Sequence, residues 1–391
     1  MKWQKIKLGS LFQIKHGWAF KGEYFSNEGQ LIIITPGNFF EKGGFRQLVG
    51  KEKFYLGEFP EEFLLKRNDV VIAMTEQGPG LLGSPALIPS DEKYLHNQRI
   101  GLIHNVKTDM IDPLFIYRLF FTSIVRNEIF GSATGTKVKH TAPKRIYDIE
   151  VPNPPITTQR KIVSILSAYD DLIENNLKRI KLLEEQAFLT YKGVLTIDRL
   201  MQISVFDYAH IMSGGTPSTT NPNFWEGEIP FFTPKDLSSQ SGYYLNDTER
   251  KLTELGLEKC NSKLFPRDTI FITARGTVGK LVLSKIPSAI SQSNYAITTR
   301  NGSSNYFLFL ALIDKVNHFK QLAVGGVFDT IIVDTFKMIF IELPNERIID
   351  QFNIDIKPIF QLIDTLQKQN TKLREARDIL LPKLMNGQIE V

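Results

Sequence analysis

The chain contains an internal repeat whose period is close to half of its 391 residues. Several segments of the first half recur in the second half in the same order. The matched pairs are residues 8–17 (LGSLFQIKHG) with 205–214 (VFDYAHIMSG), 32–36 with 230–234, 67–75 with 267–274, 115–121 with 307–313, and 145–152 with 337–344. Each match is weak alone, but order and spacing hold across the chain. The repeat predicts two copies of one fold, which we expect a rough two-fold axis to relate.

Each copy is followed by a long amphipathic segment. Residues 157–191 carry apolar side chains in steps of four and three, which is the period of a helix that packs against another helix. An ordinary core helix is the simpler alternative. The segment from residue 344 repeats the pattern, so we predict an antiparallel helix pair. The predicted seam positions are Leu166, Tyr169, Ile173, Asn176, Ile180 and Leu183 in the first helix and Ile359, Ile363, Leu366, Asn370 and Leu373 in the second.

Two kinds of residue modify this prediction. A buried asparagine in each seam, Asn176 and Asn370, costs stability but helps to fix the register of the pair. Pro358 lacks a backbone N–H, so it predicts a break or kink that divides the C-terminal segment into a short helix and a long one.

Composition limits the class of protein. A chain of 391 residues exceeds one compact core, and hydrophobic and charged contents of 42% and 23% are ordinary for a globular protein. The single cysteine, Cys260, excludes an internal disulfide framework, and with no signal peptide we expect a cytoplasmic location. Apolar runs are far too short for a membrane span. A net charge of +5 permits nucleic-acid binding without establishing it.

Short β-branched runs between Gly, Pro, Asn and Asp alternate with helical patterns in both halves, which favours an α+β fold for each. We therefore expect a first globular domain over residues 1–152, a central long helix over 153–195, a second domain over 196–343, and a C-terminal helical region over 344–391 that packs on the central helix.

Three motifs that suggest an enzyme fail on inspection. Residues 78–83 fit G-x-G-x-x-G, but Pro85 and Pro89 follow where a phosphate-binding helix must begin. Residues 276–280 resemble half a P-loop, with Leu281 where a magnesium-binding hydroxyl belongs. Residues 153–156 (NPPI) lack the aromatic residue that stacks on a flipped base. The six histidines are scattered, so we expect neither catalytic nor metal-binding residues.

The remaining polar residues suit recognition of DNA. Residues 134–145 are basic and can bind phosphates, although a solvated basic surface is the simpler alternative. The loop at 97–99, its expected counterpart at 292–294, and the glycine turns carry Arg, Asn and Gln, which read base edges. Ordinary loop polarity is the alternative for each. The candidate DNA-binding residues are Gln77, Asn97, Gln98, Arg99, Lys137, Lys139, His140, Lys144, Arg145, Arg275, Lys280, Gln292 and Asn294.

Several segments together resemble one protein family. Residues 154–185 between two divergent copies, the closing residues 373–389 (LREARDILLPKLMNGQI), the openings at 8–17 and 206–218, and ARGTVGK at 274–280 resemble the specificity subunit of type I restriction–modification systems. The likeness covers nearly the whole chain. The first copy departs from the second at 75–83 (TEQGPGLLG), where the resemblance is less informative.

The resemblance implies a function without chemistry in this chain. Each globular domain would bind one half of a bipartite DNA target, and the helix pair would set the spacer. Methyltransferase subunits carrying S-adenosylmethionine, and translocase and nuclease subunits using ATP and Mg²⁺, would join it, so no cofactor is expected here. A stand-alone adenine methyltransferase and a non-enzymatic DNA-binding scaffold are the alternatives.

Overall fold

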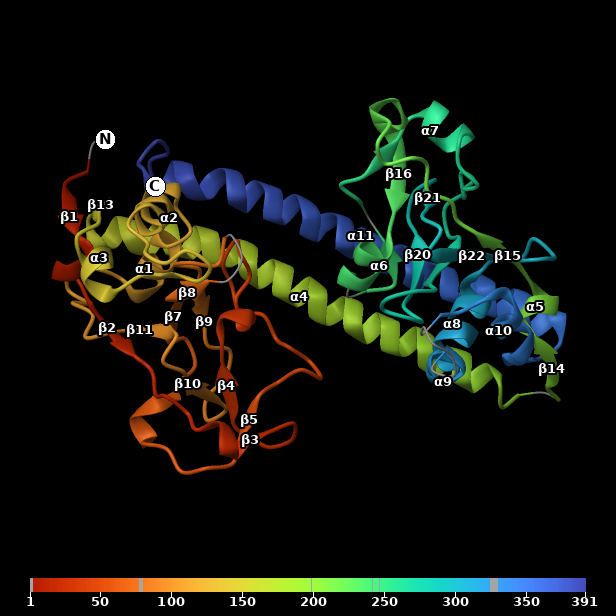
Figure 1. Cartoon of the computed structure of the whole chain (residues 1–391), viewed down its shortest axis with the longest axis horizontal. Helices are drawn as coiled ribbons and strands as arrows, with labels where there is room; N and C mark the ends of the chain where they lie inside the picture. Colours follow the sequence, from red (N-terminus) through yellow and green to blue (C-terminus); the bar gives the residue numbers. More distant parts are fainter. Residues whose placement is uncertain (1–2, 77–79, 198, 241, 246, 324–329) are drawn as a thin grey trace. The chain divides into compact units, whose positions relative to one another are not determined.

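The computed structural model describes residues 3–76, 80–197, 199–240, 242–245, 247–323 and 330–391 (Figure 1). The chain divides into two compact units, Met1–Leu172 with Lys372–Val391 (unit 1) and Ile173–Thr371 (unit 2). Each unit combines one α+β domain with part of each long helix, α4 (Ile156–Val194) and α11 (Glu346–Met385). The predicted fold class, two similar α+β domains with two long helices, is confirmed.

Unit 1 is built on two small sheets whose central strands are short runs of mostly buried apolar residues. The first sheet is antiparallel, in the order β2 (Gln13–His16), β11 (Ile100–His104), β7 (Val70–Ala73), β9 (Pro85–Leu87). The second has the order β3 (Phe25–Ser26), β5 (Phe54–Tyr55), β4 (Ile32–Ile34), β10 (Tyr94–His96), β6 (Leu64–Leu65). The short helices are α1 (Pro113–Leu119), α2 (Ser123–Gly131) and α3 (Pro143–Tyr147).

Unit 2 repeats this plan. Its larger sheet has the order β15 (Ala209–Ser213), β22 (Asn294–Thr299), β19 (Ile270–Thr273), β20 (Leu281–Ser284), β17 (Tyr244–Leu245). The smaller one has the order β18 (Lys251–Leu252), β16 (Trp225–Phe232), β21 (Ala289–Ile290). The short helices are α5 (Val205–Tyr208), α6 (Pro234–Ser239), α7 (Glu254–Glu258), α8 (Tyr306–Asp314), α9 (Val316–Ala323) and α10 (Val333–Met338).

The strand order shows that the two domains are copies of one fold. The antiparallel order β2-β11-β7-β9 recurs as β15-β22-β19-β20, and the parallel pair β4–β10 recurs as β16–β21. In both units a last two-stranded ladder precedes the long helix, β1 (Lys5–Lys7) with β13 (Glu150–Pro152) and β14 (Met201–Ser204) with β23 (Phe340–Leu343). The units differ in the sheet that contains the parallel pair: strands flank the pair on both sides in unit 1, whereas only β18 flanks it in unit 2.

A glycine follows the first sheet strand in each copy because another backbone lies against it. A Cβ on Gly17 would lie 2.3 Å from the carbonyl oxygens of His96 and Asn97, and a Cβ on Gly214 would lie 2.3 Å from those of Ile290 and Ser291. Only glycine permits so close an approach. The shared contact also makes Asn97 equivalent to Ser291.

The halves of α4 and α11 pack together within each unit. In unit 1 the start of α4, through Ile162 and Leu166, shares a core with Leu381 and Leu384 near the end of α11. In unit 2 the end of α4 shares a core with Phe352 and other residues near the start of α11, so the helices run antiparallel. Of the predicted seam residues, Leu166, Ile173, Asn176, Ile180, Ile363, Leu366 and Asn370 are buried, and Tyr169, Leu183, Ile359 and Leu373 are half-buried.

The prediction of a helix break at Pro358 is wrong, because α11 runs without interruption from Glu346 to Met385. Pro358 lies on the exposed side of the helix, so water can reach the carbonyl of Ile354 that the proline leaves without an N–H donor. Buried Ile356 and Phe360 on either side hold the helix against the core of unit 2.

Replacing Pro358 with alanine is therefore expected to stabilise unit 2 by about 1–2 kcal/mol. Alanine restores the missing backbone hydrogen bond. The stability gained in the helix is larger than the stability lost because the unfolded chain no longer contains the stiff proline. Urea denaturation of the variant measures the difference, and Lys357→Ala at the neighbouring exposed position is the control. A stability equal to that of the control would show that α11 tolerates the proline at no cost.

None of the helices formed by the described residues is long and apolar enough to cross a membrane.

Candidate nucleic-acid interface

A tight hairpin in unit 1 carries most of the predicted phosphate-binding residues. Thr134 and His140 exchange backbone hydrogen bonds of 3.0 and 2.8 Å, and Gly135 adopts the positive φ of 102° that the turn requires. The last two residues of this basic hairpin (residues 134–140) form β12 (Lys139–His140), which pairs with β8 (Thr75–Glu76).

The positive charges of this region have few internal partners. Lys137, His140 and Lys144 are exposed, while Lys139 lies 3.5 Å above the centre of the Phe130 ring. Arg145 Nη1 donates to Thr134 Oγ1 at 3.0 Å. Within the described part of the chain, no carboxylate forms an ion pair with these five side chains. They are therefore available to an anionic ligand, and we call Lys137, Lys139, His140, Lys144 and Arg145 the basic segment.

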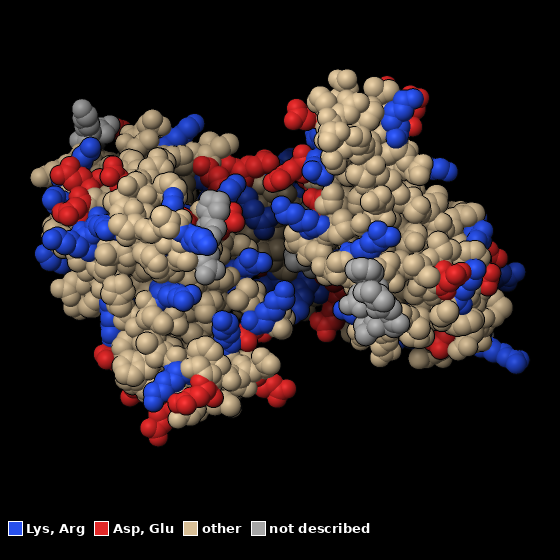
Figure 2. All heavy atoms as spheres, viewed as in Figure 1, with Lys and Arg blue, Asp and Glu red and all other residues tan. Residues whose placement is uncertain are grey.

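The basic segment is a local feature of unit 1. On the face shown in Figure 2, lysine and arginine side chains are scattered among acidic and uncharged ones and form no single continuous stripe. The strand paired with the hairpin also contributes no competing surface charge, because Glu76 is buried and accepts a hydrogen bond from the Leu82 backbone at 2.8 Å.

The loop at 97–99 presents two of its three polar side chains. Asn97 is buried, and its Oδ1 accepts from the Arg99 backbone at 3.1 Å. Gln98 and Arg99 are exposed, and Gln98 N donates to Trp18 O at 3.1 Å. Trp18, which the sequence analysis did not select, is 41% exposed beside this loop. No sequence signal marked Trp18, because its exposure and its contact with Gln98 arise only in the fold.

Backbone hydrogen bonds bring this loop and the basic hairpin to the same strand. Met74 N donates to Arg99 O at 3.0 Å, and Thr141 N donates to Met74 O at 3.0 Å. Unit 2 repeats this ladder: Ala274 N donates to Ser293 O at 2.8 Å, and Ile331 N donates to Ala274 O at 2.9 Å. The duplicated fold therefore flanks the same strand with the same two segments in each unit.

The ladder corrects the predicted match between the two polar loops. Because Arg99 is equivalent to Ser293, the loop at 97–99 matches residues 291–293, one position earlier than expected. Gln98 and Gln292 thus occupy the same position, and both are exposed. Asn294 takes the place of Ile100 and is fully buried, with Nδ2 donating to Phe232 O at 3.1 Å. A base edge cannot reach the Asn294 side chain in this conformation.

The glycine turns connect strands and do not open helices. Gly83 precedes β9, and the turn at 276–280 connects β19 to β20, so neither offers the helix N-terminus that a dinucleotide or P-loop site needs. Arg275 is exposed, whereas Lys280 is half-buried. Gln77 lies outside the described residues.

Lys280 faces a carboxylate of α4. Burial lowers the pKa of Lys280, and the nearby charge of Glu184 partly opposes that shift. Burial raises the pKa of Glu184 to about 7, although the Tyr243 backbone N–H donates to its Oε1 at 2.8 Å and Lys280 favours its ionised form. Lys280 is therefore partly withdrawn from solvent and within range of the Glu184 charge, and it stays a candidate for contact with DNA.

Unit 2 is expected to lose stability as the pH rises toward 8, and Glu184→Gln should remove that loss. The folded state holds the Glu184 proton more tightly than the unfolded chain does, so its contribution is full below pH about 4.5 and lost as pH rises through about 7. Glutamine keeps the acceptor for Tyr243. Relative to wild type, the variant should gain up to about 3 kcal/mol between pH 5 and 8 in urea denaturation.

The control is Glu185→Gln, at the exposed neighbouring position. An identical pH dependence for wild type and Glu184→Gln would rule out this carboxyl as its source.

The histidines and acids assemble no metal-binding group of three or more within the described residues. His96 is fully buried beside the Ile100 carbonyl, with Nε2 at 2.8 Å, and burial lowers its pKa to about 4. This enclosed imidazole joins the two ends of the loop at 97–99, because His96 precedes the loop and Ile100 follows it.

Comparison with known families decides what this architecture belongs to. The family described as the type I restriction modification DNA specificity domain matches residues 1–185 and again residues 201–377. The chain belongs to this specificity-domain family. Its two matches cover the two structural copies, each with most of its following helix, and they confirm the family resemblance.

Named relatives of this specificity-family chain are similar over part of their length. The HindI specificity subunit of Haemophilus influenzae is 31% identical over 186 residues, which is 47% of this chain and 40% of that protein. The MjaIX specificity subunit of Methanocaldococcus jannaschii is 28% identical over 171 residues, 43% of this chain and 40% of that protein. Each alignment therefore spans about two fifths of the relative.

A solved structure agrees over almost the whole fold. The S subunit of a type I restriction–modification system from M. genitalium superposes with a TM-score of 0.60 at 16% identity, covering 98% of this chain and 96% of that one. At this identity the likeness establishes the fold of the specificity-family chain and not its target.

Proposed function

We propose that this chain is a specificity subunit that binds double-stranded DNA and directs modification and restriction subunits to a bipartite target. The observation that carries the proposal is the duplication: one fold occurs twice in a specificity-family chain, with a glutamine exposed at the same place in each copy. Two copies of a reading domain suit a target with two separate parts, because each copy can take one half-site.

Two kinds of contact are proposed for unit 1. The unpaired charges of the basic segment bind phosphates, which position the domain without carrying sequence information. Gln98 and Arg99, on the loop beside the same strand, reach base edges, since Gln pairs with adenine and Arg with guanine in the major groove. In unit 2 the equivalent reader is Gln292, and Arg275 follows Ala274, whose backbone N–H donates to Ser293 O beside it.

The long helices are proposed to set the spacer between half-sites. A helix of 39 residues is about 58 Å long at 1.5 Å per residue, which corresponds to at most about 17 base pairs of DNA at 3.4 Å each. Inserting whole helical turns in both helices should lengthen the spacer and leave both half-sites unchanged.

The partners are proposed from the relatives. HindI and MjaIX are named as specificity subunits of type I restriction enzymes. We propose that methyltransferase subunits holding S-adenosylmethionine and restriction subunits using ATP and Mg²⁺ assemble with this chain in the cytoplasm. The chain itself would carry no catalytic residue and no cofactor. Titration of the isolated chain with S-adenosylmethionine should give no binding heat, whereas a stand-alone methyltransferase would give a saturable signal.

The decisive experiment is adenine-methylation mapping in a host that expresses the chain with its methyltransferase subunits. The expected result is one methylated motif made of two short sequences separated by unspecified bases. Exchanging residues 1–150 for those of a homologue should change one half only. A continuous motif, or a change in both halves, would overturn the proposal, and the same exchange at residues 196–343 is the matched control.

A further inference from the structure

Two aspartates occupy equivalent positions on the long helices. Asp170 on α4 and Asp364 on α11 are 194 residues apart, the same interval that separates Asn176 from Asn370. Those asparagines form a hydrogen bond, with Asn176 Nδ2 donating to Asn370 Oδ1 at 3.0 Å.

A second pair of residues confirms this correspondence. Gln159 and Asn353 obey the same interval, and each accepts a backbone hydrogen bond at the start of a domain helix, from Asp112 at 2.9 Å and from Phe307 at 3.2 Å. Equal spacing therefore reflects equal structural position, and the two aspartates are duplicates of one residue.

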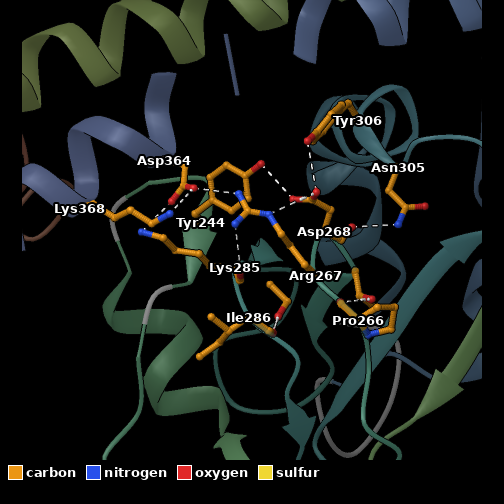
Figure 3. A network of polar contacts seen from close by, with 12 residues as sticks. Tyr244, Pro266, Arg267, Asp268, Lys285, Ile286, Asn305, Tyr306, Asp364 and Lys368 are labelled. Atoms are coloured by element: carbon orange, nitrogen blue, oxygen red, sulfur yellow. Dashed lines mark hydrogen bonds and ion pairs between the residues drawn. The ribbon is translucent and has the colours of Figure 1, made fainter. Parts of the chain in front are cut away.

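Asp364 binds cations from the globular domain of unit 2 (Figure 3). Its side chain is 8% exposed and forms ion pairs with Arg267 at 2.8 Å, Lys285 at 2.7 Å and Lys368 at 3.0 Å. Arg267 precedes β19 and Lys285 follows β20, whereas Lys368 lies on α11 itself. Burial alone raises the pKa of Asp364, but the hydrogen bonds from these three cations outweigh it and lower the pKa to about 2.

Asp170 makes the corresponding connection in unit 1. Its two oxygens lie 2.7 Å from Arg118 Nη1 and 2.7 Å from Arg377 Nη1. Arg118 belongs to α1 of the globular domain and is almost fully buried, and its Nη2 also donates to Ser167 Oγ on α4 at 3.3 Å. Arg377 belongs to α11. One carboxylate thus joins the domain to both long helices.

The cations are not duplicated although the aspartates are. Arg67, the residue that matches Arg267 in the repeat, is exposed, and its backbone N–H donates to Asp91 Oδ1 at 2.8 Å. The globular domain of unit 1 instead supplies Arg118, from α1. The aspartate on the helix therefore occupies the same position in both units, whereas its cationic partners come from different positions in the two globular domains. This is expected if the attachment point on the helix matters more than which cation binds it.

The ion pairs add charge-assisted contacts to domain–helix interfaces that otherwise consist of apolar packing and single hydrogen bonds, such as those accepted by Gln159, Asn353 and Glu184. Burial of apolar area holds a domain on its helices without fixing a rotation, because the hydrophobic effect is non-directional. A charge-assisted hydrogen bond has a narrow range of length and angle. We propose that Asp170 and Asp364 are positioning residues that fix how each globular domain sits on its own helices, and so hold each half-site reader in register with the spacer. This inference rests on the proposed function.

The test uses the complete complex of this chain with its methyltransferase subunits and a set of DNA substrates. The substrates carry the mapped target with its native spacer, with the spacer one base pair longer or shorter, and with single substitutions in each half-site. Initial methylation rates give two ratios, one for spacer discrimination and one for base discrimination. The wild-type complex is measured first and sets both reference ratios. If it shows no bipartite recognition, the proposed function is wrong, and this outcome is distinct from a failure of the present inference.

Asp364→Asn is expected to reduce spacer discrimination about tenfold and to leave base discrimination unchanged, since one charge-assisted network is lost while the reading loops stay intact. Asp170→Asn should do the same. Asp364→Glu, which keeps the charge, should recover part of the discrimination. Asp355→Asn on the exposed face of α11 is the control and should behave as wild type.

Two results would overturn the inference. An unchanged spacer ratio in Asp364→Asn would show that the ion pairs do not position the domain. An equal loss of rate on every substrate, with both ratios kept, would show a purely structural role. If Asp364→Asn does not assemble, Lys285→Gln removes one cation and leaves the carboxylate paired with Arg267 and Lys368. An unchanged spacer-discrimination ratio in Lys285→Gln would then overturn the inference.

Discussion

Replacing Phe360 with alanine is expected to lower the free energy of unfolding of unit 2 by about 3–5 kcal/mol. Phe360 is fully buried where α11 meets the globular domain, and its ring stacks on Tyr306 at 4.3 Å with an interplanar angle of 16°. It also contacts the rings of Tyr243, Tyr244 and Phe309. Alanine would leave a cavity among rigid aromatic rings that cannot collapse into it.

Guanidinium denaturation followed by tyrosine fluorescence measures this loss. The control is Leu362→Ala on the same helix, which is 37% exposed and should cost less than about 1 kcal/mol. Similar costs for the two variants would mean that the aromatic cluster does not hold α11 to the domain. A large loss confined to Phe360→Ala would locate the attachment at this cluster.

Removing four charges of the basic segment is expected to weaken DNA binding about 10- to 100-fold at 0.1 M salt, because fewer phosphates are neutralised. The variant is Lys137→Ala, Lys139→Ala, Lys144→Ala and Arg145→Ala combined. Because each phosphate contact contributes about 0.9 to the slope of log affinity against log salt, the slope should fall by about 3 to 4. Fluorescence anisotropy of labelled DNA, titrated with the complex at several salt concentrations, gives both quantities.

The matched control keeps the charges and changes the side chains. A variant with Lys137→Arg, Lys139→Arg, Lys144→Arg and Arg145→Lys should bind with nearly the wild-type salt slope. Sequence preference should stay the same in both variants, since phosphate contacts carry no base information. A slope that the alanine variant leaves at its wild-type value would remove the basic segment from the interface.

The parts of the fold that could be predicted are those written in local patterns. The repeat predicts two copies because matching segments keep their order, and the apolar period predicts long helices because one face of each must be covered. Strand order could not be predicted, since β2 pairs with β11 across more than eighty intervening residues. Pro358 misled because helix propensity is a local quantity, whereas buried Ile356 and Phe360 on either side of it keep α11 one uninterrupted helix.

The sequence could predict the types of residue in the candidate site better than their individual positions. Exposed Gln98, Arg99, Lys137 and Arg275 suit the chemistry expected of them, and their contact with DNA stays a prediction. Asn294 was selected for its side chain, but a one-residue shift in the repeat places it in the core. The paired aspartates were missed, although a repeat aligned at an interval of 194 would have shown an acid at the same position in both helices.

From its order of residues alone, this protein had to form two related domains, each leading into an amphipathic helix, because duplication and helical period are properties of the chain itself. Which polar side chains remain free to meet a ligand depends on partners far away along the chain. The Asn294 side chain donates a hydrogen bond to Phe232 O, 62 residues earlier in the chain. The Asp364 carboxylate accepts one from Arg267, 97 residues earlier. Packing in three dimensions decides which side chains solvent can reach and which charges are paired. Only the folded structure could therefore separate the exposed candidates for DNA contact from the polar residues that have partners inside the protein.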